Sequence, residues 1–490
     1  MVNYERILKL SLERGFYFPS SDIYSDSPAG FWEYGPNGNK MKNKFIDLWR
    51  REMIRSDEMI EIDGSQIMSK NVFVASGHID NFSDPILTCI KCRTTLRADK
   101  YISEKTEINI PERLSNEEID LIIRQHNLQC PKCGSDFNKT ERFNMMFKLG
   151  IGPNNDDAYL RPETCQTIFV DFIRIYKTMR GKLPFPIAQV GKSFRNEIAP
   201  RQSLLRLREF YQAEIEVFCN PNHLDDVPKF DDIKQTVLTI DNGEIFRITA
   251  DEAVEKKIIP NKLIGYYLSL LFQFYEKTGI DMNKSRLRKL SDDEKAFYAT
   301  TAFDLELQTS LGWLELVACN YRSNYDLSQH SKISKEKMEI IDPITNEKVL
   351  PHVFELSLGI DRSIYSILET SFAEESETKR TYLKLKPYLS PILVGILPLV
   401  KKPEIEQLAK QIYNNLKKDF DIFYDDSGSI GRRYRRLEEI GTPFAITIDY
   451  DSLIDNTVTV RYRDTMEQKR LKANDLRCFL CENIKIYVSK

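Results

Sequence analysis

Apolar residues recur at two spacings along this chain, and each spacing predicts a different kind of element. After a turn at 34–38, Met41, Phe45 and Leu48 follow one another at helical spacing, which predicts a long amphipathic helix. Between 187 and 218, apolar and polar residues alternate in two runs that are joined by a proline-containing turn, which predicts an antiparallel hairpin with a long loop. Helices and strands are therefore both expected within the first half of the chain.

The second half continues this mixture and then changes character. Alternating runs at 313–319 and 352–358 are expected to join the sheet of the hairpin, and 262–298 is mostly helical by its spacing. After 391 the order becomes strand, helix, strand, which is typical of a separate α/β domain of about 100 residues. The prediction is an α/β protein whose α+β core contains an antiparallel sheet with flanking helices.

The expected domain boundaries follow from these changes of pattern. A segment bounded by cysteines interrupts two stretches that otherwise look continuous, so we interpret it as an insertion into the core domain. The length of 490 residues also implies several domains. We expect the first part of the core at 1–84, the insertion at 85–142, the second part of the core at 143–386 with a helical insertion at about 222–300, and the C-terminal α/β domain at 387–490.

Composition excludes several classes of protein without identifying a function. Hydrophobic residues make up 41% and charged residues 29%, as in ordinary globular proteins, so disorder and collagen are excluded. The longest apolar run, 391–400, is too short for a bilayer, and the N-terminal segment carries acids and no cleavage site, so a cytoplasmic protein without a membrane segment is expected. With 70 basic and 73 acidic residues, the net charge of -3 offers no general attraction for nucleic acid.

Two cysteine pairs lie inside the predicted insertion. Cys89 and Cys92 form one CxxC knuckle, and Cys130 and Cys133 form another. In a reducing compartment such pairs are considered first as metal ligands rather than as disulfides. Four thiolates complete a tetrahedral site with no open position, so a structural Zn2+ ion is predicted. Two unrelated thiol pairs are the alternative.

Polar residues recur at alternate positions within the predicted strands. Alternate residues of a strand face the same side of a sheet, so such pairs form a polar patch. A single pair is explained by the solvent face of a half-exposed sheet, and Glu216 by itself is expected to be exposed. The residues that share faces are Arg195 and Glu197, then Phe210, Gln212, Glu214 and Glu216, and finally Glu355 and Ser357.

Taken together, these polar positions suggest the floor of a site for a small zwitterion and a polyphosphate. Arginine presents a planar fork to phosphate oxygens and stabilises the charge that develops there during in-line displacement. Converging carboxylates raise one another's pKa, and an ammonium ligand among them removes that repulsion. An amino acid is such a ligand.

Several separated segments resemble the class II aminoacyl-tRNA synthetases. FRNE at 194–197 and REFYQAEIEVF at 208–218 are similar to their motif 2, and SLGIDR at 357–362 is similar to motif 3. Blocks in the family's order over nearly the whole chain are more specific than any one short motif. The segments that resemble the homodimeric glycyl-tRNA synthetases in particular include GFYFPSSDIYSDSPAGFWEYGPNG at 15–38, RPETCQTIF at 161–169, GWLELVACNYRSNYDLSQH at 312–330 and YDDSGSIGRRYRRLEEIGTPFAITIDY at 424–450.

The resemblance implies an aminoacyl-tRNA ligase that activates glycine with ATP to glycyl-adenylate and transfers glycine to the 3′ end of its tRNA. In such a site Arg195 would hold the α-phosphate of ATP, Arg362 would hold the γ-phosphate, and Glu315 would face ATP and its Mg2+. The implied catalytic residues are Arg195, Glu197, Arg206 and Arg362. The implied ATP contacts are Arg195, Asn196, Glu197, Leu205, Arg206, Phe210, Leu314, Glu315, Gly359 and Arg362.

For glycine, the resemblance implies amino-group contacts from Glu163, Glu214 and Glu355. Arg322 would match a carboxylate contact, and Arg97 would make the insertion part of the wall of the site. A missing methylene is worth only about 1–3 kcal/mol, so larger amino acids would have to be excluded by steric clash. The implied glycine-binding residues are Arg97, Glu163, Phe210, Gln212, Glu214, Arg322, Glu355 and Ser357.

The C-terminal domain concentrates basic charge in GRRYRR at 431–436. There phosphate contact and base stacking are plausible, whereas a solvated helix face is the alternative. The resemblance favours contact with tRNA(Gly) near its anticodon stem, and the long helix after 38 resembles motif 1, which implies a homodimer. The expected tRNA-binding residues are Arg432, Arg433, Arg435 and Arg436.

Three other functions compete with this hypothesis. A class II synthetase for another amino acid would share the core and the C-terminal domain. A non-catalytic relative that binds nucleic acid or assists a polymerase would not need Arg195, Glu197 and Arg362, which are all present. A zinc-ribbon DNA-binding protein would leave most of the chain unexplained.

Overall fold

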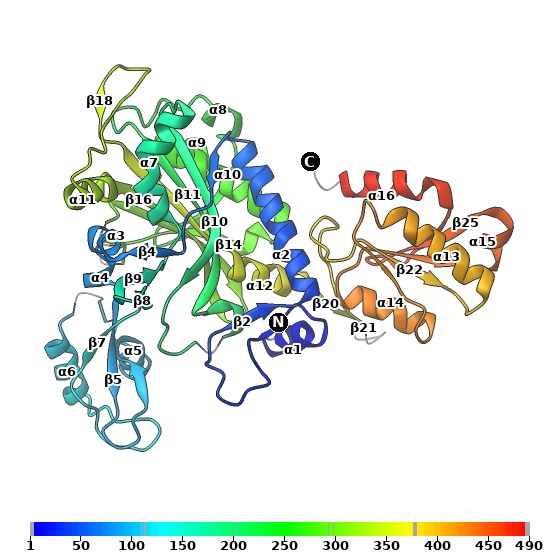
Figure 1. Cartoon of the computed structure of the whole chain (residues 1–490), viewed down its shortest axis with the longest axis horizontal. Helices are drawn as coiled ribbons and strands as arrows, with labels where there is room; N and C mark the ends of the chain where they lie inside the picture. Colours follow the sequence, from blue (N-terminus) through cyan, green and yellow to red (C-terminus); the bar gives the residue numbers. More distant parts are fainter. Residues whose placement is uncertain are drawn as a thin grey trace.

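A nine-stranded sheet lies at the centre of the larger part of the molecule (Figure 1). The computed structural model describes residues 4–485 except 109, 112–113, 201, 293, 297 and 376–379. Neighbouring strands of the sheet pair antiparallel except β10 with β3 and β12 with β14. In sheet order the strands are β13 (Ile245–Thr249), β12 (Val237–Asp241), β14 (Ser285–Lys289), β15 (Thr301–Thr309), β16 (Gly312–Ser323), β19 (His352–Gly359), β11 (Glu209–Cys219), β10 (Phe185–Phe194) and β3 (Ile60–Ile62).

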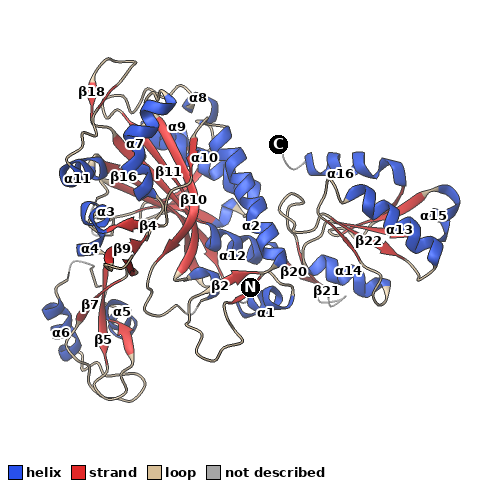
Figure 2. Ribbon diagram, in the orientation of Figure 1, coloured by secondary structure: helices blue, strands red, loops and turns tan. Residues whose placement is uncertain are grey.

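Helices cover both faces of this sheet (Figure 2). One face packs with α1 (Tyr4–Glu13), α2 (Pro36–Trp49), α10 (Lys262–Thr278) and α12 (Ile360–Ser371) in the largest apolar core. The other face packs with α7 (Cys165–Met179) and α11 (Tyr325–Ser334) in a second core. The predicted helix after the turn at 34–38 is confirmed, because Met41, Phe45 and Leu48 all point into the first core with 2% exposure or less.

Shorter elements join the sheet to its surroundings. A π-helical turn continues α2 through Arg50–Arg55, and two small helices precede α10. The remaining elements of this part are β1 (Tyr17–Pro19), β2 (Trp32–Tyr34), β4 (Ile67–Ser69), α3 (Lys70–Ala75), α4 (His78–Asn81), β8 (Lys148–Ile151), β9 (Asp156–Leu160), α8 (Phe230–Ile233), α9 (Ala250–Glu255), β17 (Ile340–Ile341), β18 (Lys348–Val349), β20 (Phe372–Glu375) and β21 (Arg380–Leu383).

The cysteine-bounded segment projects from the core as a small unit with its own apolar centre (Figure 1). Leu87, Ile102 and Ile119 are fully buried in that centre. The longer helix of the unit, α6, begins with a capping box formed by Ser115 and Glu118. The elements of the unit are β5 (Ser83–Thr88), β6 (Thr95–Arg97), α5 (Ala98–Thr106), α6 (Asn116–Gln125) and β7 (Glu141–Asn144).

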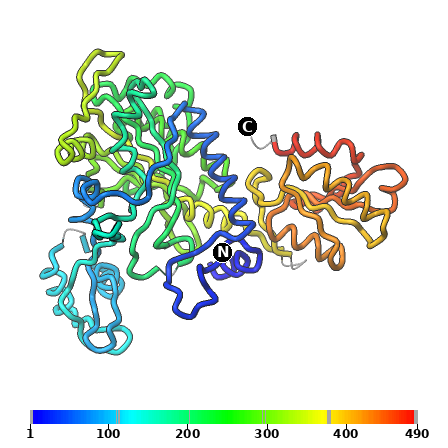
Figure 3. The backbone as a smooth tube through the Cα atoms, in the orientation of Figure 1, coloured from blue at the N-terminus to red at the C-terminus, as the bar shows by residue number. Residues whose placement is uncertain are grey.

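The C-terminal part forms a separate lobe beside the core (Figure 3). Its strands pair in the order β23-β22-β24-β25-β26, with helices packed against them, which confirms the predicted α/β pattern. Asp421 of this lobe forms ion pairs with Lys40 and Lys44 of α2, at 2.8 and 3.0 Å. Its elements are β22 (Val394–Pro398), α13 (Pro403–Leu416), β23 (Ile422–Tyr424), α14 (Ile430–Glu439), β24 (Phe444–Ile448), α15 (Tyr450–Asp455), β25 (Thr457–Tyr462), β26 (Gln468–Lys472) and α16 (Leu476–Lys485).

The expected helical insertion at about 222–300 is wrong for much of its length. α10 is a helix, but β12, β13 and β14 are strands that extend the central sheet. In β14 the side chains alternate, with Leu287 fully buried while Arg286 and Arg288 pair with acids of β15. The side chains of this segment alternate with a period of two because it is a strand of the central sheet, between β12 and β15. Among the described residues, no helix is long and apolar enough to span a membrane.

Candidate active site

A cavity of about 690 Å³ opens over the middle strands of the central sheet, within the size range of small-molecule sites. β11, β16 and β19 lie side by side there, so residues from distant parts of the chain reach one wall. The predicted site residues in that wall are Arg97, Glu163, Arg195, Glu197, Leu205, Arg206, Phe210, Gln212, Leu314, Glu315, Glu355, Ser357, Gly359 and Arg362. The wall does not include Asn196, Glu214 or Arg322.

Acids and hydroxyls of β11 and β19 form the most buried side of the cavity. Glu214 lies opposite Ser357 in the strand register and accepts a hydrogen bond of 2.6 Å from its hydroxyl. Gln212 donates to the same oxygen, Oε1, at 3.1 Å, and the Thr164 hydroxyl donates to the other oxygen, Oε2, at 2.5 Å. Burial, followed by the charge of Glu163, raises the pKa of Glu214. Glu214 thus lies behind Ser357 and Gln212, and it orients both of them.

Arg322 lies behind the cavity and not in its wall. Its side chain is 1% exposed, and its Nε and Nη2 donate to the two oxygens of Asp326, each at 2.7 Å. Nη1 donates to Glu355 at 2.9 Å. The predicted contact of Arg322 with a substrate carboxylate stays a prediction, and in this structure the guanidinium is bound by acids on both of its edges. Arg322 thus fixes the position of Glu355.

Glu355 combines this ion pair with access to the cavity. Asn320 donates to its second oxygen at 2.8 Å. Burial raises the pKa of Glu355 to about 7, although the charge of Arg322 opposes the change. The neighbouring acids Glu163 and Glu214 also favour protonation of Glu355. A cationic ligand in the cavity would reverse this effect and stabilise the ionised carboxylate.

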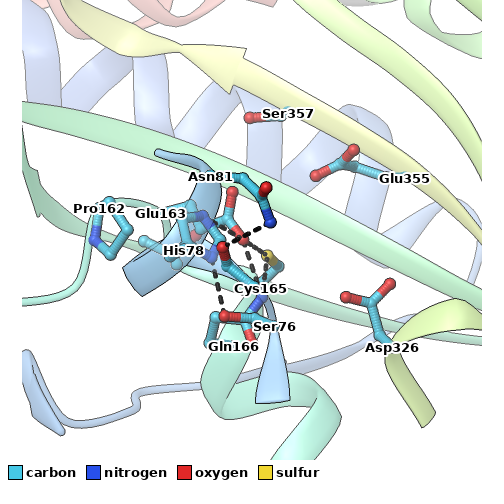
Figure 4. A network of polar contacts seen from close by, with 12 residues as sticks. Ser76, His78, Asn81, Pro162, Glu163, Cys165, Gln166, Asp326, Glu355 and Ser357 are labelled. Carbon is cyan, nitrogen blue, oxygen red and sulfur yellow. Dashed lines mark hydrogen bonds and ion pairs between the residues drawn. The ribbon is translucent and has the colours of Figure 1, made fainter. Parts of the chain in front are cut away.

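Glu163 approaches the same region from the turn before α7 (Figure 4). Its Oε1 accepts from Gln166 at 2.8 Å and from the Cys165 thiol at 3.0 Å, and it lies 3.5 Å from Nε2 of His78. Burial by itself would raise the pKa of Glu163, but the charges of His78 and Arg322 outweigh it and hold that pKa well below its usual range. Glu163 is therefore an ionised carboxylate in a buried wall.

Glu216 differs from the expectation that it is solvent-exposed. It is fully buried opposite Glu355 in the strand register, and neither of its carboxylate oxygens has a hydrogen-bond partner. Burial, followed by the charge of Glu355, raises its pKa well above the ordinary value. Glu216 thus carries a proton beneath the wall. α7 and α11 cover this face of the sheet, and the alternating pattern of β11 alone does not reveal them.

Arginines and an aromatic ring form another side of the cavity. The guanidinium of Arg195 lies 5.4 Å from the ring centre of Phe210 and at the same distance from Phe82. Arg206 forms an ion pair of 2.6 Å with Glu197 across the hairpin loop. Arg362, at the start of α12, contacts Glu315 of β16 at 3.4 Å. Asn196, by contrast, is held at the rim through its backbone, which donates to Met145.

The cavity also contains residues that the sequence did not identify. Asp304 of β15 lies in the wall near Glu315, and burial together with the Glu315 charge raises its pKa to about 7. Trp313 packs on Arg286, with 3.9 Å from the guanidinium to the ring centre. Alternation along β15 and β16 could have placed both side chains in the wall. The further unforeseen residues there include Lys100, Tyr211, Leu290, Tyr298, Asn320 and Asp361.

The insertion contributes a wall residue and a cluster of thiols. Arg97 lines the cavity and is held by Asp84 at 2.7 Å and by Asp99. Away from the cavity, the four predicted cysteines have ligand atoms within 4.8 Å of one another. Hydrogen bonds from Thr94 lower the pKa of the Cys92 thiol to about 6, so this thiol readily ionises. The four sulfurs of Cys89, Cys92, Cys130 and Cys133 can together hold a tetrahedral metal ion.

The arginines of α14 do not form one surface. Arg433 is only 3% exposed and donates to the carbonyls of Pro398 and Asp425, so its predicted contact with tRNA is wrong. Arg436 is bound to Asp425. Arg432 and Arg435 are exposed. Helical spacing explains the division, because one edge of α14 must pack on the sheet of its own domain.

Two segments of this chain match known families. Residues 143–240 match the family described as tRNA synthetase class II core domain (G, H, P, S and T), and residues 393–483 match the family described as Anticodon binding domain. Among solved structures, prolyl-tRNA synthetase from Cryptosporidium parvum, complexed with halofuginone and AMPPNP, is similar with a TM-score of 0.57. That similarity covers 98% of this chain and 75% of the other, and at 13% sequence identity it shows the fold alone.

Three curated relatives are similar over nearly the whole chain. The glycine–tRNA ligase of Methanocaldococcus jannaschii is 38% identical and covers 98% of this chain and 99% of the relative. The glycine–tRNA ligase of Pyrococcus furiosus is 38% identical, with 96% and 97% covered. That of Methanothrix thermoacetophila is 36% identical, with 97% and 96% covered.

Proposed function

Since the chain belongs to the glycine–tRNA ligases, which are class II aminoacyl-tRNA synthetases, we propose that the cavity over β11, β16 and β19 is where glycine is activated and transferred. The glycine carboxylate attacks the α-phosphorus of ATP, which forms glycyl-adenylate and releases pyrophosphate. A terminal ribose hydroxyl of tRNA then takes the glycyl group. The observation that carries this assignment is one cavity that joins buried carboxylates to several arginines.

The buried acids would bind the ammonium group of glycine. Glu163 and Glu355 belong to the same buried group, with ligand atoms within 4.8 Å of each other, so one ammonium can contact both. Glu214 supports this site indirectly through its bonds to Ser357 and Gln212. Since the wall around these groups is closed by buried side chains, a substituent on the α-carbon would clash with it. Steric exclusion accounts for a preference that one methylene could not provide by binding energy.

The arginines would hold ATP in line for attack. Arg195 would contact the α-phosphate, and Arg206 and Arg362 would contact the outer phosphates. Phe210 provides a flat ring for the adenine, and Glu197 would seat the adenine end while it orients Arg206. Catalysis then rests on positioning and on stabilisation of the developing phosphate charge, with no protein nucleophile.

Mg2+ fits the acidic part of this wall. The like charge of Glu315 raises the pKa of Asp304, so the two carboxylates are close enough to interact, and a hard divalent cation would relieve that interaction. Glu315, with Asp304 beside it, would hold the ion. When bound with ATP, Mg2+ neutralises charge on the phosphate oxygens.

Zn2+ fits the four thiols of the insertion. The sulfur of Cys89 lies 3.5 Å from that of Cys133, and that of Cys92 lies 3.6 Å from that of Cys130. These separations suit sulfurs placed about 2.3 Å from one central zinc. Metal analysis of freshly purified protein should find one zinc per chain, and Cys92→Ser should lower that content. Protein that contains no zinc would contradict the proposal.

The remaining proposals concern partners and location. Arg432 and Arg435 would contact tRNA(Gly) from the C-terminal lobe. α2, which resembles motif 1, would take part in a homodimer, and sedimentation would show a mass near twice 57.2 kDa. All nine cysteines are free, which suits a reducing compartment such as the cytoplasm.

The exchange of pyrophosphate with ATP tests the proposed substrate directly. Glycine should stimulate exchange, whereas alanine, proline, threonine and histidine should not. Stimulation by one of those four would indicate a class II synthetase for another amino acid. No exchange with any amino acid would indicate a non-catalytic relative, although the cavity retains Arg195, Glu197 and Arg362.

A further inference from the structure

His78 touches the proposed glycine site from behind, and the sequence patterns did not identify it. It opens α4, the one-turn helix that precedes the cysteine-bounded insertion, and its side chain is 9% exposed. Figure 4 shows His78 directed at Glu163, with Ser76 on its other side. His78 itself does not line the cavity. Any effect on glycine must therefore pass through Glu163.

The contacts of Glu163 divide unequally between its two oxygens. Oε1 receives the bonds from Gln166 and Cys165 and lies nearest to His78. Within the described residues, no side chain donates to Oε2, although Glu163 lines the cavity. Because one oxygen is held from behind, the other remains available to a ligand in front.

The ring of His78 has little freedom to turn away. Its Nδ1 is hydrogen-bonded to the Ser76 hydroxyl at 2.8 Å, so Nε2 faces Glu163. The edges and faces of Phe73 and Phe82 pack around the ring, with centres 6.2 and 5.3 Å away. Nε2 lies 3.5 Å from Oε1 of Glu163, a polar contact in which an ionised carboxylate can only accept.

The returning end of the insertion holds the helix that carries His78. The amide of Asn144, the last residue of β7, donates to the carbonyl of Ile79 at 2.8 Å and to that of His78 at 3.3 Å. Phe82, at the entry to the insertion, packs against Arg195 as well as against His78. The root of the insertion therefore contacts the supports of both the acidic and the arginine side of the cavity.

From this arrangement we propose that His78 is a positioning residue for glycine binding: it holds Oε1 of Glu163 so that Oε2 faces the ammonium group of the substrate. The inference rests on the proposed role of Glu163 in binding that group. His78 does not touch substrate and takes no part in the reaction at phosphorus. His78 therefore affects the affinity for glycine and not the affinity for ATP.

Steady-state pyrophosphate exchange with full-length His78→Ala and His78→Gln tests the proposal. His78→Ala should raise the KM for glycine by about 10- to 100-fold, as expected when a buried carboxylate loses its polar partner, with less than about a twofold change in the KM for ATP. His78→Gln retains an amide donor at similar reach and should restore part of the loss. His223→Gln, an exposed histidine paired with Asp226, is the matched control and should leave both constants unchanged.

A double-mutant cycle with Glu163→Gln separates positioning from general damage. Once Glu163 has lost its charge, His78→Ala should change the KM for glycine by less than about twofold, because its effect passes through that carboxylate. Full additivity of the two effects would overturn the proposal, and so would equal changes in the constants for glycine and ATP. If Glu163→Gln alone raises the KM for glycine while the His78 variants do not, only this inference fails. If Glu163→Gln has no effect, the proposed role of Glu163 fails as well.

Discussion

The acidic side and the arginine side of the cavity differ in how deeply their charged groups are buried and how fully they are paired. Glu355 and Arg322 are 3% and 1% exposed and already satisfy each other before any substrate is present. Arg362 is 36% exposed, and among the described residues it contacts the carbonyls of Leu205 and Glu315 and the carboxylate of Glu315. The acidic side is a preformed and buried network. The arginine side is more open, with half-buried arginines of which Arg206 is paired with Glu197.

The difference follows from the size of the two substrates. Glycine has few atoms, so it provides little binding energy with which to order a loose site, and its pocket must be preorganised. ATP brings several charged phosphates and a flat base, and these can order half-buried arginines as they bind. We therefore expect substitutions on the acidic side to change the use of glycine alone, and substitutions on the arginine side to change the chemical step.

The largest effect is expected for Arg195→Ala. Removal of a positioned cation from the α-phosphate should lower the rate of glycyl-adenylate formation by about 10²- to 10³-fold. Single-turnover adenylate formation measures this rate. Arg174→Ala, at an 83% exposed position on α7, is the matched control and should retain the normal rate. A normal rate in Arg195→Ala would remove the distinction between the two sides.

Glu355→Gln should have the next largest effect, and only on glycine. The variant keeps the shape of the side chain but loses a buried charge that would pair with the ammonium group, so the KM for glycine should rise by about 10- to 100-fold. The KM for ATP, measured in the same exchange assay, should change little. A parallel rise in both constants would show that the network supports the whole cavity.

The affinity for glycine should also weaken in acid. The pKa of Glu355 is about 7, and the protonated form cannot pair with an ammonium, so the KM for glycine should rise by up to about tenfold per unit below pH 7. Arg322, Glu163 and Glu214 face the same carboxylate and set this midpoint. A pH series of exchange assays measures the effect. The steep acid limb should disappear in Glu355→Gln, and its persistence there would assign it to another group.

The smallest effect is expected far from the cavity. Arg432→Ala should raise the KM for tRNA in aminoacylation by about 3- to 10-fold, because it removes one exposed phosphate contact, while pyrophosphate exchange stays normal. Arg433→Ala should instead lower the melting temperature of the C-terminal lobe, because Arg433 is buried among carbonyls. Equal effects of the two variants on tRNA would contradict the division of α14 into an exposed and a buried face.

Sequence patterns predicted the positions that depend on local spacing. Alternation along β11 and β19 predicts that Gln212 and Ser357 face one side, and both line the cavity wall. The CxxC spacing predicts a four-thiol group, and the four ligand atoms lie close together. Patterns failed where another element decides the environment. Arg322, near the end of β16, is bound by Asp326 at the start of α11 and by Glu355 of the neighbouring strand β19. The alternating pattern of β16 alone does not reveal either contact.

Burial was the least predictable property. Glu214 and Glu216 face the same side of β11, and both are buried there because α7 and α11 cover that face of the sheet. Local spacing predicts helix over 285–289. The segment is a strand because it pairs with β15, and that pairing cannot be inferred from the spacing of nearby residues. No sequence pattern indicated His78, because a single histidine beside a glycine forms no repeat from which a role can be inferred.

A crystal structure of the protein with a non-hydrolysable analogue of glycyl-adenylate tests the central claim most directly. The analogue's ammonium group should lie within hydrogen-bond distance of Glu163 Oε2 and Glu355, and its phosphate mimic should lie against Arg195. Phe210 should stack on the adenine. An ammonium group bound away from both glutamates, or an adenine placed on the acidic side, would contradict the division of the cavity into a preformed glycine site and a more open ATP site lined by arginines.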